Sequence, residues 1–364
     1  MITTAIFPGR YVQGDGALDQ LGGELLRLGG RALGVLDPFA FDTLASGLQW
    51  DREGPCIHRE RFGGECSGHE IDRLARMGRE RDVNVVVGIG GGKALDTAKA
   101  VAHCLDRPVA VVPTIASTDA PCSALSVIYT PEGAFERYLV LPRNPDLVLV
   151  DTGVVARAPV RLLVSGMGDA LSTWFEAEDC RTRGGVNMTG RPGPMTAYAL
   201  SRLCYDTLLE YGVAARTACE AGVVTPALER IVEANTLLSG LGFESGGLAA
   251  AHAIHNGLTA LHETHRFWHG EKVAIGTLAL LALTGRPPAL ADEVFSFCEA
   301  VGLPTTLADI GLAGVGDERL MLVAERACQP GETIHNEPTE VTPRRVLAAL
   351  KAVDAEGRRR RAAR

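Results

Sequence analysis

Three features are scarce in this chain of 364 residues, and each scarcity excludes a class of protein. No apolar run reaches the roughly 18 residues that a membrane-spanning helix needs, so we expect no membrane segment. The 36 Lys and Arg are outnumbered by 44 Asp and Glu, which gives a net charge of −8 and argues against general nucleic-acid binding. The nine cysteines are scattered and include no CxxC pair, which excludes a disulfide framework and favours reduced thiols in the cytoplasm.

The remaining composition is that of a folded enzyme-sized protein. Hydrophobic residues make up 46% of the chain, which is enough to fill a core and excludes a disordered chain. The length fits one large domain or two of ordinary size. The first residues lack a basic start followed by a long apolar stretch, so we expect no secretion signal. The arginines at 358–361 we interpret as a solvated end of the chain.

Short valine-rich runs alternate with helical patterns over the first 150 residues. These runs are too short for isolated helices and end in Gly, Pro or Asp, which is typical of buried strands. The expected strands span 32–37, 83–92, 109–114 and 147–151. Helical patterns at 69–82 and 93–105 lie between them. This alternation predicts a mostly parallel sheet with helices on both faces.

From about residue 160 the pattern changes to a helical period, punctuated by stretches of Gly and Pro. The expected helices lie within 159–180, 194–212, 227–243 and 271–285. We therefore expect two domains, an α/β domain over 1–159 and an all-α domain over 160–364. A cleft between the two domains is the expected place for a ligand.

A glycine cluster, GIGGGKALDTAKA, occupies residues 88–100, where a strand is expected to turn into a helix. Glycines let the backbone approach a ligand, and free amides at a helix start favour phosphate. A Walker loop is excluded, because Val87 stands where its first Gly belongs and Ala94 offers no hydroxyl for magnesium. The usual dinucleotide spacing also fails, because Lys93 takes the place of its third glycine. A tight turn without a ligand is the alternative.

Asp37 ends the first expected strand. A carboxylate at this position can accept hydrogen bonds from ribose hydroxyls and would repel a 2′-phosphate. It can equally cap the helix that follows. Asp37 and the glycine turn together indicate a dinucleotide, with NAD preferred over NADP.

Histidines are concentrated in one short segment of the chain. Five of the nine are His252, His255, His262, His265 and His269. His252 and His255 are three residues apart and share a helix face. HETH (262–265) is not the HExxH metalloprotease motif, whose histidines are four apart. For the group we predict a metal site with two imidazoles and a carboxylate, although any single histidine can be an ordinary core or surface residue. Asp169 is the carboxylate candidate, with a helix N-cap as its alternative role.

Five long segments of the chain closely resemble the glycerol dehydrogenase branch of the iron-containing (group III) alcohol dehydrogenase family. They are GIGGGKALDTAKA (88–100), VVPTIASTDAPCSALSVIYT (111–130), PVRLLVSGMGDALSTWFEA (159–177), GFESGGLAAAHAIHNGLT (242–259) and HGEKVAIGTLA (269–279). The resemblance implies an N-terminal Rossmann-like domain, a C-terminal helical domain, and an active-site cleft that holds NAD and a divalent metal. The implied reaction is oxidation of glycerol and related vicinal diols, with dihydroxyacetone as the product from glycerol.

The resemblance also implies roles for particular residues. The metal ligands would be Asp169, His252 and His269, holding Zn²⁺, with Fe²⁺ as the alternative. The cofactor-binding residues would be Asp37, Gly92, Lys93, Thr114, Ser117, Ser123, Leu125 and Tyr129. Asp119 would orient the polyol and Phe243 would form a pocket wall. His255, or a relay of water molecules, would move the proton.

The chain departs from the family pattern at a few positions, and alternatives to the implied reaction follow. Ala94 and Pro38 replace residues more usual in the family, and the segment 262–268 leaves the preferred polyol open. A lyase of the dehydroquinate synthase type, or a dehydrogenase for a phosphorylated polyol, would need several basic residues, but only Arg266 and Lys272 lie near the expected metal ligands in sequence. A catalytically silent protein is a further alternative. The resemblance implies a homo-oligomer, such as an octamer.

Overall fold

The computed structural model describes residues 2–44 and 55–363, which form two compact units. The α/β unit consists of Ile6–Pro159 together with Ala218–Leu237. The helical unit consists of the residues up to Ala5, Val160–Thr217, and those from Leu238 onwards. The segment 218–237 therefore belongs to the unit that holds the sheet, although helical segments on either side of it belong to the helical unit. No helix in the described ranges is both long and apolar enough to cross a membrane.

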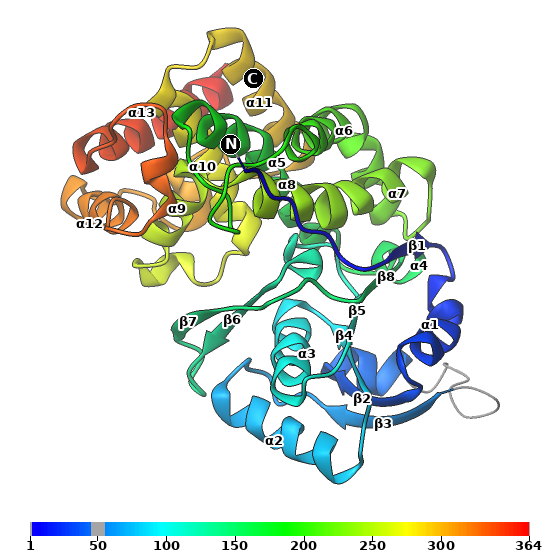
Figure 1. Cartoon of the computed structure of the whole chain (residues 1–364). Coiled ribbons are helices and arrows are strands. Elements are labelled where there is room, and N and C mark those ends of the chain that lie inside the picture. Colours follow the sequence, from blue (N-terminus) through cyan, green and yellow to red (C-terminus); the bar gives the residue numbers. More distant parts are fainter. Residues whose placement is uncertain (1, 45–54, 364) are drawn as a thin grey trace. The chain divides into compact units, whose positions relative to one another are not determined.

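A six-stranded sheet with only parallel pairings forms the centre of the α/β unit (Figure 1). In order across the sheet, its strands are β1 (Tyr11–Gly14), β8 (Leu147–Asp151), β5 (Val109–Pro113), β4 (Val85–Gly90), β2 (Arg31–Leu36) and β3 (Cys56–Arg61). The four expected strands are confirmed as β2, β4, β5 and β8. The two edge strands were not predicted, because they are only partly buried and carry mixed side chains. The antiparallel hairpin β6 (Leu125–Tyr129) and β7 (Phe135–Val140) was also missed.

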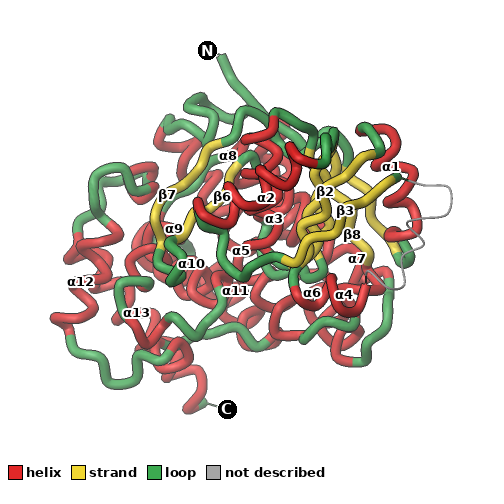
Figure 2. Tube along the Cα trace, turned by 90° about the horizontal axis from the view of Figure 1, so that it is seen from below, coloured by secondary structure: helices red, strands yellow, loops and turns green. Residues whose placement is uncertain are grey.

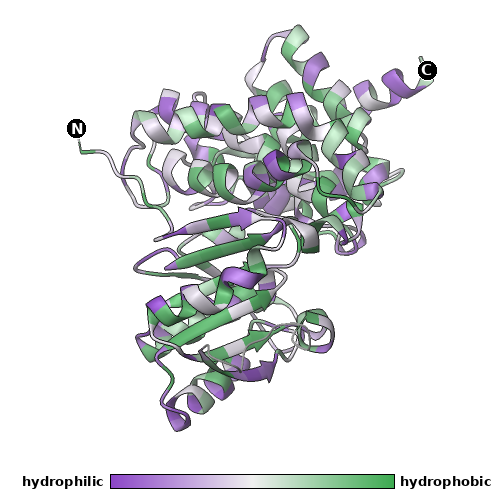
Figure 3. Cartoon of the chain, turned by 90° about the vertical axis from the view of Figure 1, so that its right-hand side faces the viewer, coloured by the Kyte–Doolittle hydropathy of each residue, from purple (hydrophilic) through white to green (hydrophobic). Residues whose placement is uncertain are grey.

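Helices cover both faces of this sheet, as the alternating pattern predicts. On one face, Leu21 and Leu25 of α1 (Leu21–Leu28) belong to a buried cluster with Val85, Val87 and other strand residues. On the other face, α3 (Gly92–Leu105) lies so close to β4 that a Cβ at Gly88 would meet the Cβ of Ala98 at 2.6 Å. Several strands are coloured hydrophobic in Figure 3, which is consistent with burial on both sides, while others carry the hydrophilic colour. The remaining helices of the unit are α2 (Gly68–Glu80), α4 (Thr152–Ala156) and α7 (Pro226–Glu233).

The helical unit contains no strand among its described residues, and all the strands in Figure 2 belong to the α/β unit. Its helices are α5 (Val160–Arg183), α6 (Met195–Glu220, which ends in the other unit), α8 (Ser239–Gly246), α9 (Ala250–Leu258), α10 (His269–Thr284), α11 (Pro288–Val301), α12 (Asp317–Ala327) and α13 (Pro343–Ala362). Helix α10 is buried along nearly its whole length and packs against α5, α9, α11 and α13. It is the central helix of the unit.

Of the arginines near the carboxyl terminus, Arg358 and Arg359 are exposed as expected, at 69% and 67% of their side-chain surface, but Arg360 is not. They lie in the last turns of α13, and the Arg360 side chain is only 14% exposed. Arg360 pairs with Glu299 at 2.9 Å and also with Asp292, while Arg361 pairs with Asp309. The expectation was wrong for Arg360, because its acidic partners Glu299 and Asp292 lie in α11, more than 60 residues away in sequence.

Candidate metal and cofactor sites

Three helices of the helical unit bring one carboxylate and two imidazoles together. Asp169 comes from α5, His252 from α9 and His269 from the first position of α10. Asp169 Oδ1 lies 3.1 Å from His269 Nε2 and 3.4 Å from His252 Nε2. One ligand atom from each of the three residues lies within 4.8 Å of the others. The Asp169 side chain is buried, whereas that of His269 is 36% exposed, so the group is open to solvent on the His269 side.

The chemistry of this donor set fits a divalent transition metal. Burial alone would raise the pKa of Asp169, but the charge of His269 and hydrogen bonds from both imidazoles hold it well below its ordinary value. The carboxylate is therefore ionised, as a metal ligand must be. Two nitrogen ligands and one oxygen ligand leave a coordination position open, which is typical of catalytic rather than structural zinc. The alternative role of Asp169 as a helix N-cap is wrong, because α5 begins at Val160 and runs through Gly166 and Gly168.

Two glycines explain how the ligand-bearing helices come so close. A Cβ at Gly270 would lie 1.7 Å from the Ser165 carbonyl oxygen, and one at Gly168 would lie 2.4 Å from the Gly270 carbonyl oxygen. The backbones of α5 and α10 are therefore in direct contact immediately beside Asp169 and His269. A third glycine, Gly276, allows α10 to approach Ala251 of α9 in the same way, since its Cβ would lie 2.3 Å from that residue's oxygen.

Glu176 is a functional candidate that sequence reasoning missed. It is fully buried, and its Oε2 lies 2.6 Å from His252 Nδ1. Its Oε1 accepts hydrogen bonds from the backbone N–H groups of Ala249 and His252. A carboxylate on Nδ1 orients the imidazole so that Nε2 faces the metal position, as is usual for metal-binding histidines. The sequence spacing could have indicated Glu176, because it follows Asp169 by seven residues and so lies two turns along the same face of the helix.

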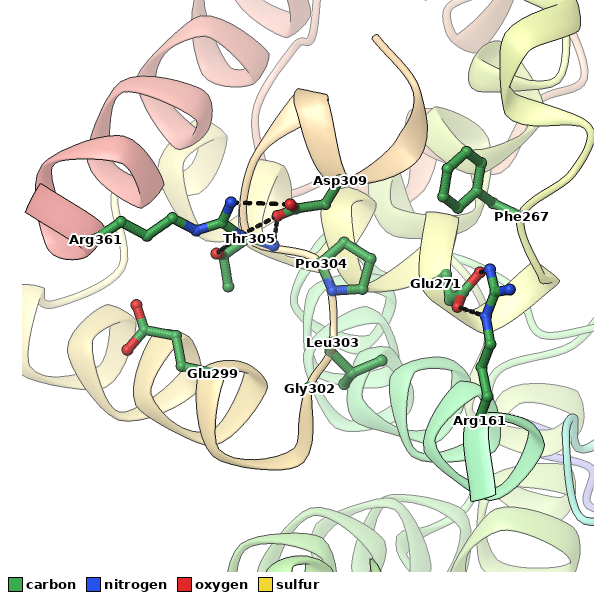
Figure 4. Close-up of a pocket in the computed structure, with 10 residues that line it drawn as sticks. All are labelled: Arg161, Phe267, Glu271, Glu299, Gly302, Leu303, Pro304, Thr305, Asp309 and Arg361. Carbon is green, nitrogen blue, oxygen red and sulfur yellow. Dashed lines mark hydrogen bonds and ion pairs between the residues drawn. The ribbon is translucent and has the colours of Figure 1, made fainter. Parts of the chain in front are cut away.

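The first turn of α10, which carries His269, is held by a charged pair. Glu271 Oε2 accepts the backbone N–H of Trp268 at 2.8 Å, while its Oε1 accepts from Arg161 Nε at 2.6 Å. Figure 4 shows this pair on the wall of a cavity of about 330 Å³. The cavity is lined by Arg161, Phe267, Glu271, Glu299, Gly302, Leu303, Pro304, Thr305, Asp309 and Arg361. None of the residues predicted for metal, cofactor or substrate lines this cavity.

The other clustered histidines fall into two groups. The His255 ring packs edge-on against His269, with 4.2 Å between ring centroids. Burial, followed by the charge of His269, holds the pKa of His255 well below its ordinary value, so this ring is neutral. The rings of His262 and His265 pack against each other, with 5.1 Å between their centroids, outside the metal group.

Phe243, the residue expected to form a pocket wall, is buried in α8 of the helical unit.

The expected cofactor residues of the α/β unit lie where its parallel strands end. Asp37 follows β2, the glycine turn follows β4, and Thr114 follows β5, at the same carboxyl edge of the sheet. Asp37 Oδ2 accepts the Gly91 N–H at 3.0 Å, and its Oδ1 accepts the Ala40 N–H at 2.8 Å. The N-cap role of Asp37 is thus observed, and the same carboxylate also reaches the glycine turn. Gly90 has a φ of +148°, and a Cβ there would meet Asp37 at 2.5 Å.

The remaining expected cofactor residues lie on α3 or follow Thr114 along the chain. Gly92 and Lys93 begin α3, and the Lys93 ammonium lies 4.9 Å from the centre of the Tyr129 ring while pairing with Glu65 at 2.6 Å. Ser117 is buried in the loop after β5, and so is Asp119, the residue expected to orient the polyol. The others are Ser123, which follows a short 3-10 turn (Ala120–Cys122), and Leu125 and Tyr129, the two ends of β6.

Comparison with known proteins agrees with this architecture. The family described as iron-containing alcohol dehydrogenase matches residues 8–152. The chain is 65% identical to a glycerol dehydrogenase of Thermotoga maritima over 362 residues, which cover 99% of each protein. It is 56% identical to a glycerol dehydrogenase of Pseudomonas putida over 96% of each. The crystal structure of a probable glycerol dehydrogenase from Sinorhizobium meliloti superposes with a TM-score of 0.93 at 47% identity, covering 98% of this chain and 99% of that one.

The parallel sheet of one unit and the Asp–His–His group of the other are consistent with a dehydrogenase that uses a dinucleotide and a metal ion. The chain belongs to the iron-containing alcohol dehydrogenase family. It is an oxidoreductase acting on CH–OH groups, and membership of the family implies NAD and a metal ion as cofactors.

Proposed function

We propose that this protein oxidises glycerol and related vicinal diols with NAD, yielding dihydroxyacetone from glycerol. One observation carries the proposal: Asp169, His252 and His269 converge within 4.8 Å in a chain 65% identical to a glycerol dehydrogenase. The proposed metal is Zn²⁺ rather than Fe²⁺, held by these three residues. When bound, such a cation supplies Lewis acidity that lowers the pKa of a substrate hydroxyl.

The protein's own residues then position the polyol and move the proton. We propose that Asp119 orients the polyol through its hydroxyls and that Phe243 forms an apolar wall of the substrate pocket. His255 is neutral and packs on His269, so one of its ring nitrogens can accept the hydroxyl proton, directly or through water. When bound, NAD would supply the redox chemistry by accepting a hydride from the secondary carbon of glycerol.

We propose that NAD binds along the carboxyl edge of the sheet. The amide groups at the start of α3, with Gly92 and Lys93, suit the pyrophosphate, because a helix N-terminus favours an anion. Asp37 suits the adenosine ribose and disfavours a 2′-phosphate. The other contacts would come from Thr114, Ser117, Ser123, Leu125 and Tyr129.

Metal analysis coupled to an NAD-reduction assay tests the proposal. We expect one zinc ion per chain and net NADH release with glycerol and 1,2-propanediol, but not with glycerol phosphate. A lyase of the dehydroquinate synthase type would return its hydride and release no NADH. NADH release only with a phosphorylated polyol, or none with any polyol by the zinc-loaded protein, would contradict the proposed reaction. His269→Ala is the matched negative control and should lose both zinc and turnover.

Three further expectations remain part of the proposal. The functional domains would be an NAD-binding domain over 1–159 and a metal- and substrate-binding domain over 160–364. The protein would assemble as a homo-oligomer, such as an octamer, which light scattering after size-exclusion chromatography measures. All nine cysteines are free thiols, which supports a reducing compartment such as the cytoplasm.

A further inference from the structure

A lysine is completely buried in the α/β unit. Lys99 lies in the middle of α3, and its side chain is 0% exposed. Lysine is almost never fully buried unless its charge is compensated. Here Asp96, one turn earlier in the same helix, provides the compensating carboxylate at 2.9 Å. A buried ammonium group also needs acceptors for its hydrogen bonds, and the acceptors around Lys99 indicate what this residue does.

The Lys99 ammonium donates to backbone carbonyl groups of a single segment. It reaches the carbonyl oxygens of Ala120 at 3.0 Å and Ser123 at 3.4 Å, and also that of Leu125. Asp96 contributes from the same side, because its Oδ2 accepts the backbone N–H of Val127 at 2.9 Å. The pair therefore fastens α3 to the segment 120–127 through charge-assisted hydrogen bonds, which are stronger than neutral ones.

Most of this segment has little regular structure to hold it in place. Between β5 and β6 the described backbone forms only the three-residue turn Ala120–Cys122. Two other buried side chains hold it at separate points, since Asn235 donates to the Ala116 oxygen at 3.0 Å and Asn144 donates to the Cys122 oxygen at 2.9 Å. Both are neutral amides. Lys99 is the charged anchor of the loop, and it holds three carbonyl groups at once.

The anchored segment carries residues of the proposed site. Ser123 and Leu125 lie within it, Ser117 and Asp119 lie just before it in the loop 116–125, and three of the four are buried. Their positions are set by the backbone that bears them, and a loop already ordered before binding loses less conformational entropy when a ligand binds. We propose that Lys99 is a positioning residue: its ammonium, held by Asp96, fixes the loop 116–125 in the conformation that binds NAD. This inference rests on the proposed function.

NADH binding to the full-length protein tests the inference, with NADH fluorescence as the readout. Lys99→Met keeps the length of the side chain and removes its charge, so we expect the NADH dissociation constant to rise about tenfold, as for the loss of a charged hydrogen bond. The matched control is Leu25→Ala, a core substitution in α1 of the same unit that is not hydrogen-bonded to the loop. It should lower thermal stability and leave the NADH dissociation constant within twofold of wild type. Equal loss of affinity in both variants, or wild-type affinity in Lys99→Met, would overturn the proposal.

A second variant and a second readout keep the test decisive. Lys99→Gln still donates to carbonyl groups but lacks the charge, so it serves where Lys99→Met does not fold, and wild-type NADH affinity in it would equally refute the proposal. Hydrogen exchange requires no cofactor: amides of 116–127 should exchange faster in the Lys99 variants than in Leu25→Ala. Zinc affinity should stay unchanged, because the expected ligands belong to the helical unit. Failure of wild-type glycerol oxidation with these loop effects intact would refute the proposed function and leave the anchor established.

Discussion

Replacing Gly270 by alanine should destroy the metal site with little change elsewhere. A methyl group at Gly270 would lie 1.7 Å from the Ser165 carbonyl oxygen and 2.8 Å from the Asp169 backbone nitrogen. Both obstacles are backbone atoms of α5, so no change of rotamer can relieve the contact. The helices α5 and α10 must therefore separate.

The size of the separation follows from the distances. Real Cβ atoms essentially never come within 3.0 Å of another heavy atom, so the gap must widen by at least 1.3 Å, the difference between 3.0 and 1.7 Å. Metal–ligand distances tolerate only about 0.2 Å. With Asp169 on one helix and His269 on the other, at least one ligand is lost. We expect zinc affinity to fall about 100-fold or more, beyond the usual effect of losing a hydrogen-bond partner of a ligand. The overpacked core should cost about 1–3 kcal/mol of stability.

A zinc titration against a competing chromophoric chelator measures the affinity, and thermal melting of the metal-free protein measures the stability. Gly357→Ala is the matched control. Gly357 lies in α13, a helix that carries none of the expected ligands, and a Cβ there would lie 2.1 Å from the Thr305 carbonyl oxygen. It should lower the melting temperature comparably and leave zinc affinity unchanged. Wild-type zinc affinity in a folded Gly270→Ala protein, or equal loss of affinity in both variants, would refute the reasoning.

Three further predictions concern carboxyl groups. Glu176→Gln should lower zinc affinity about 10–100-fold, because the Nδ1 atom of His252 loses its charged partner. Unchanged zinc affinity in the chelator competition would show that Glu176 is merely structural. Asp37→Asn keeps a side-chain oxygen that can accept the Ala40 N–H but removes the negative charge. The ratio of kcat/KM with NADP to kcat/KM with NAD should therefore rise about tenfold. An unaltered ratio in steady-state kinetics would contradict the role of Asp37 at the ribose. Burial, followed by the charge of Asp179, raises the pKa of Glu337 to about 9. Between pH ~4.3 and 9 the folded state therefore keeps a proton that the unfolded state has released, so the free energy of unfolding should fall as the pH rises, by at most about 1.4 kcal/mol per pH unit. The melting temperature of Glu337→Gln, measured across this range, should depend less on pH than that of the wild type.

Sequence pattern recovered the parts of the fold whose residues are buried on every side. The runs that became β2, β4, β5 and β8 are dense in valine because both faces of a parallel sheet are covered. The edge strand β3 reads CIHRER, in which polar and apolar residues mix because one side has no neighbouring strand. The segment 218–237 has a helical pattern like the segments around it. Only packing assigns it to the α/β unit.

The site divides in the same way. Residue type predicted a metal site in the histidine cluster with Asp169 as its carboxylate, the family resemblance implied the set Asp169, His252 and His269, and the structure places these three together. The sequence did not reveal Glu176 as the partner of His252 or Lys99 as the anchor of a loop, because each acts through contacts with residues 21 to 76 positions away.

The amino-acid sequence by itself determined the secondary structure of the buried elements, the family, and the chemical groups available for metal and dinucleotide. Those properties depend on local periodicity and on side-chain chemistry, which can be read directly from the residues of each segment. The tertiary structure alone decided which groups meet. Helices α5 and α10 touch because Gly168 and Gly270, 102 positions apart in the sequence, lack side chains where the two backbones meet, and that contact places Asp169 3.1 Å from His269. Such distances arise from the packing of whole helices, which no local pattern encodes.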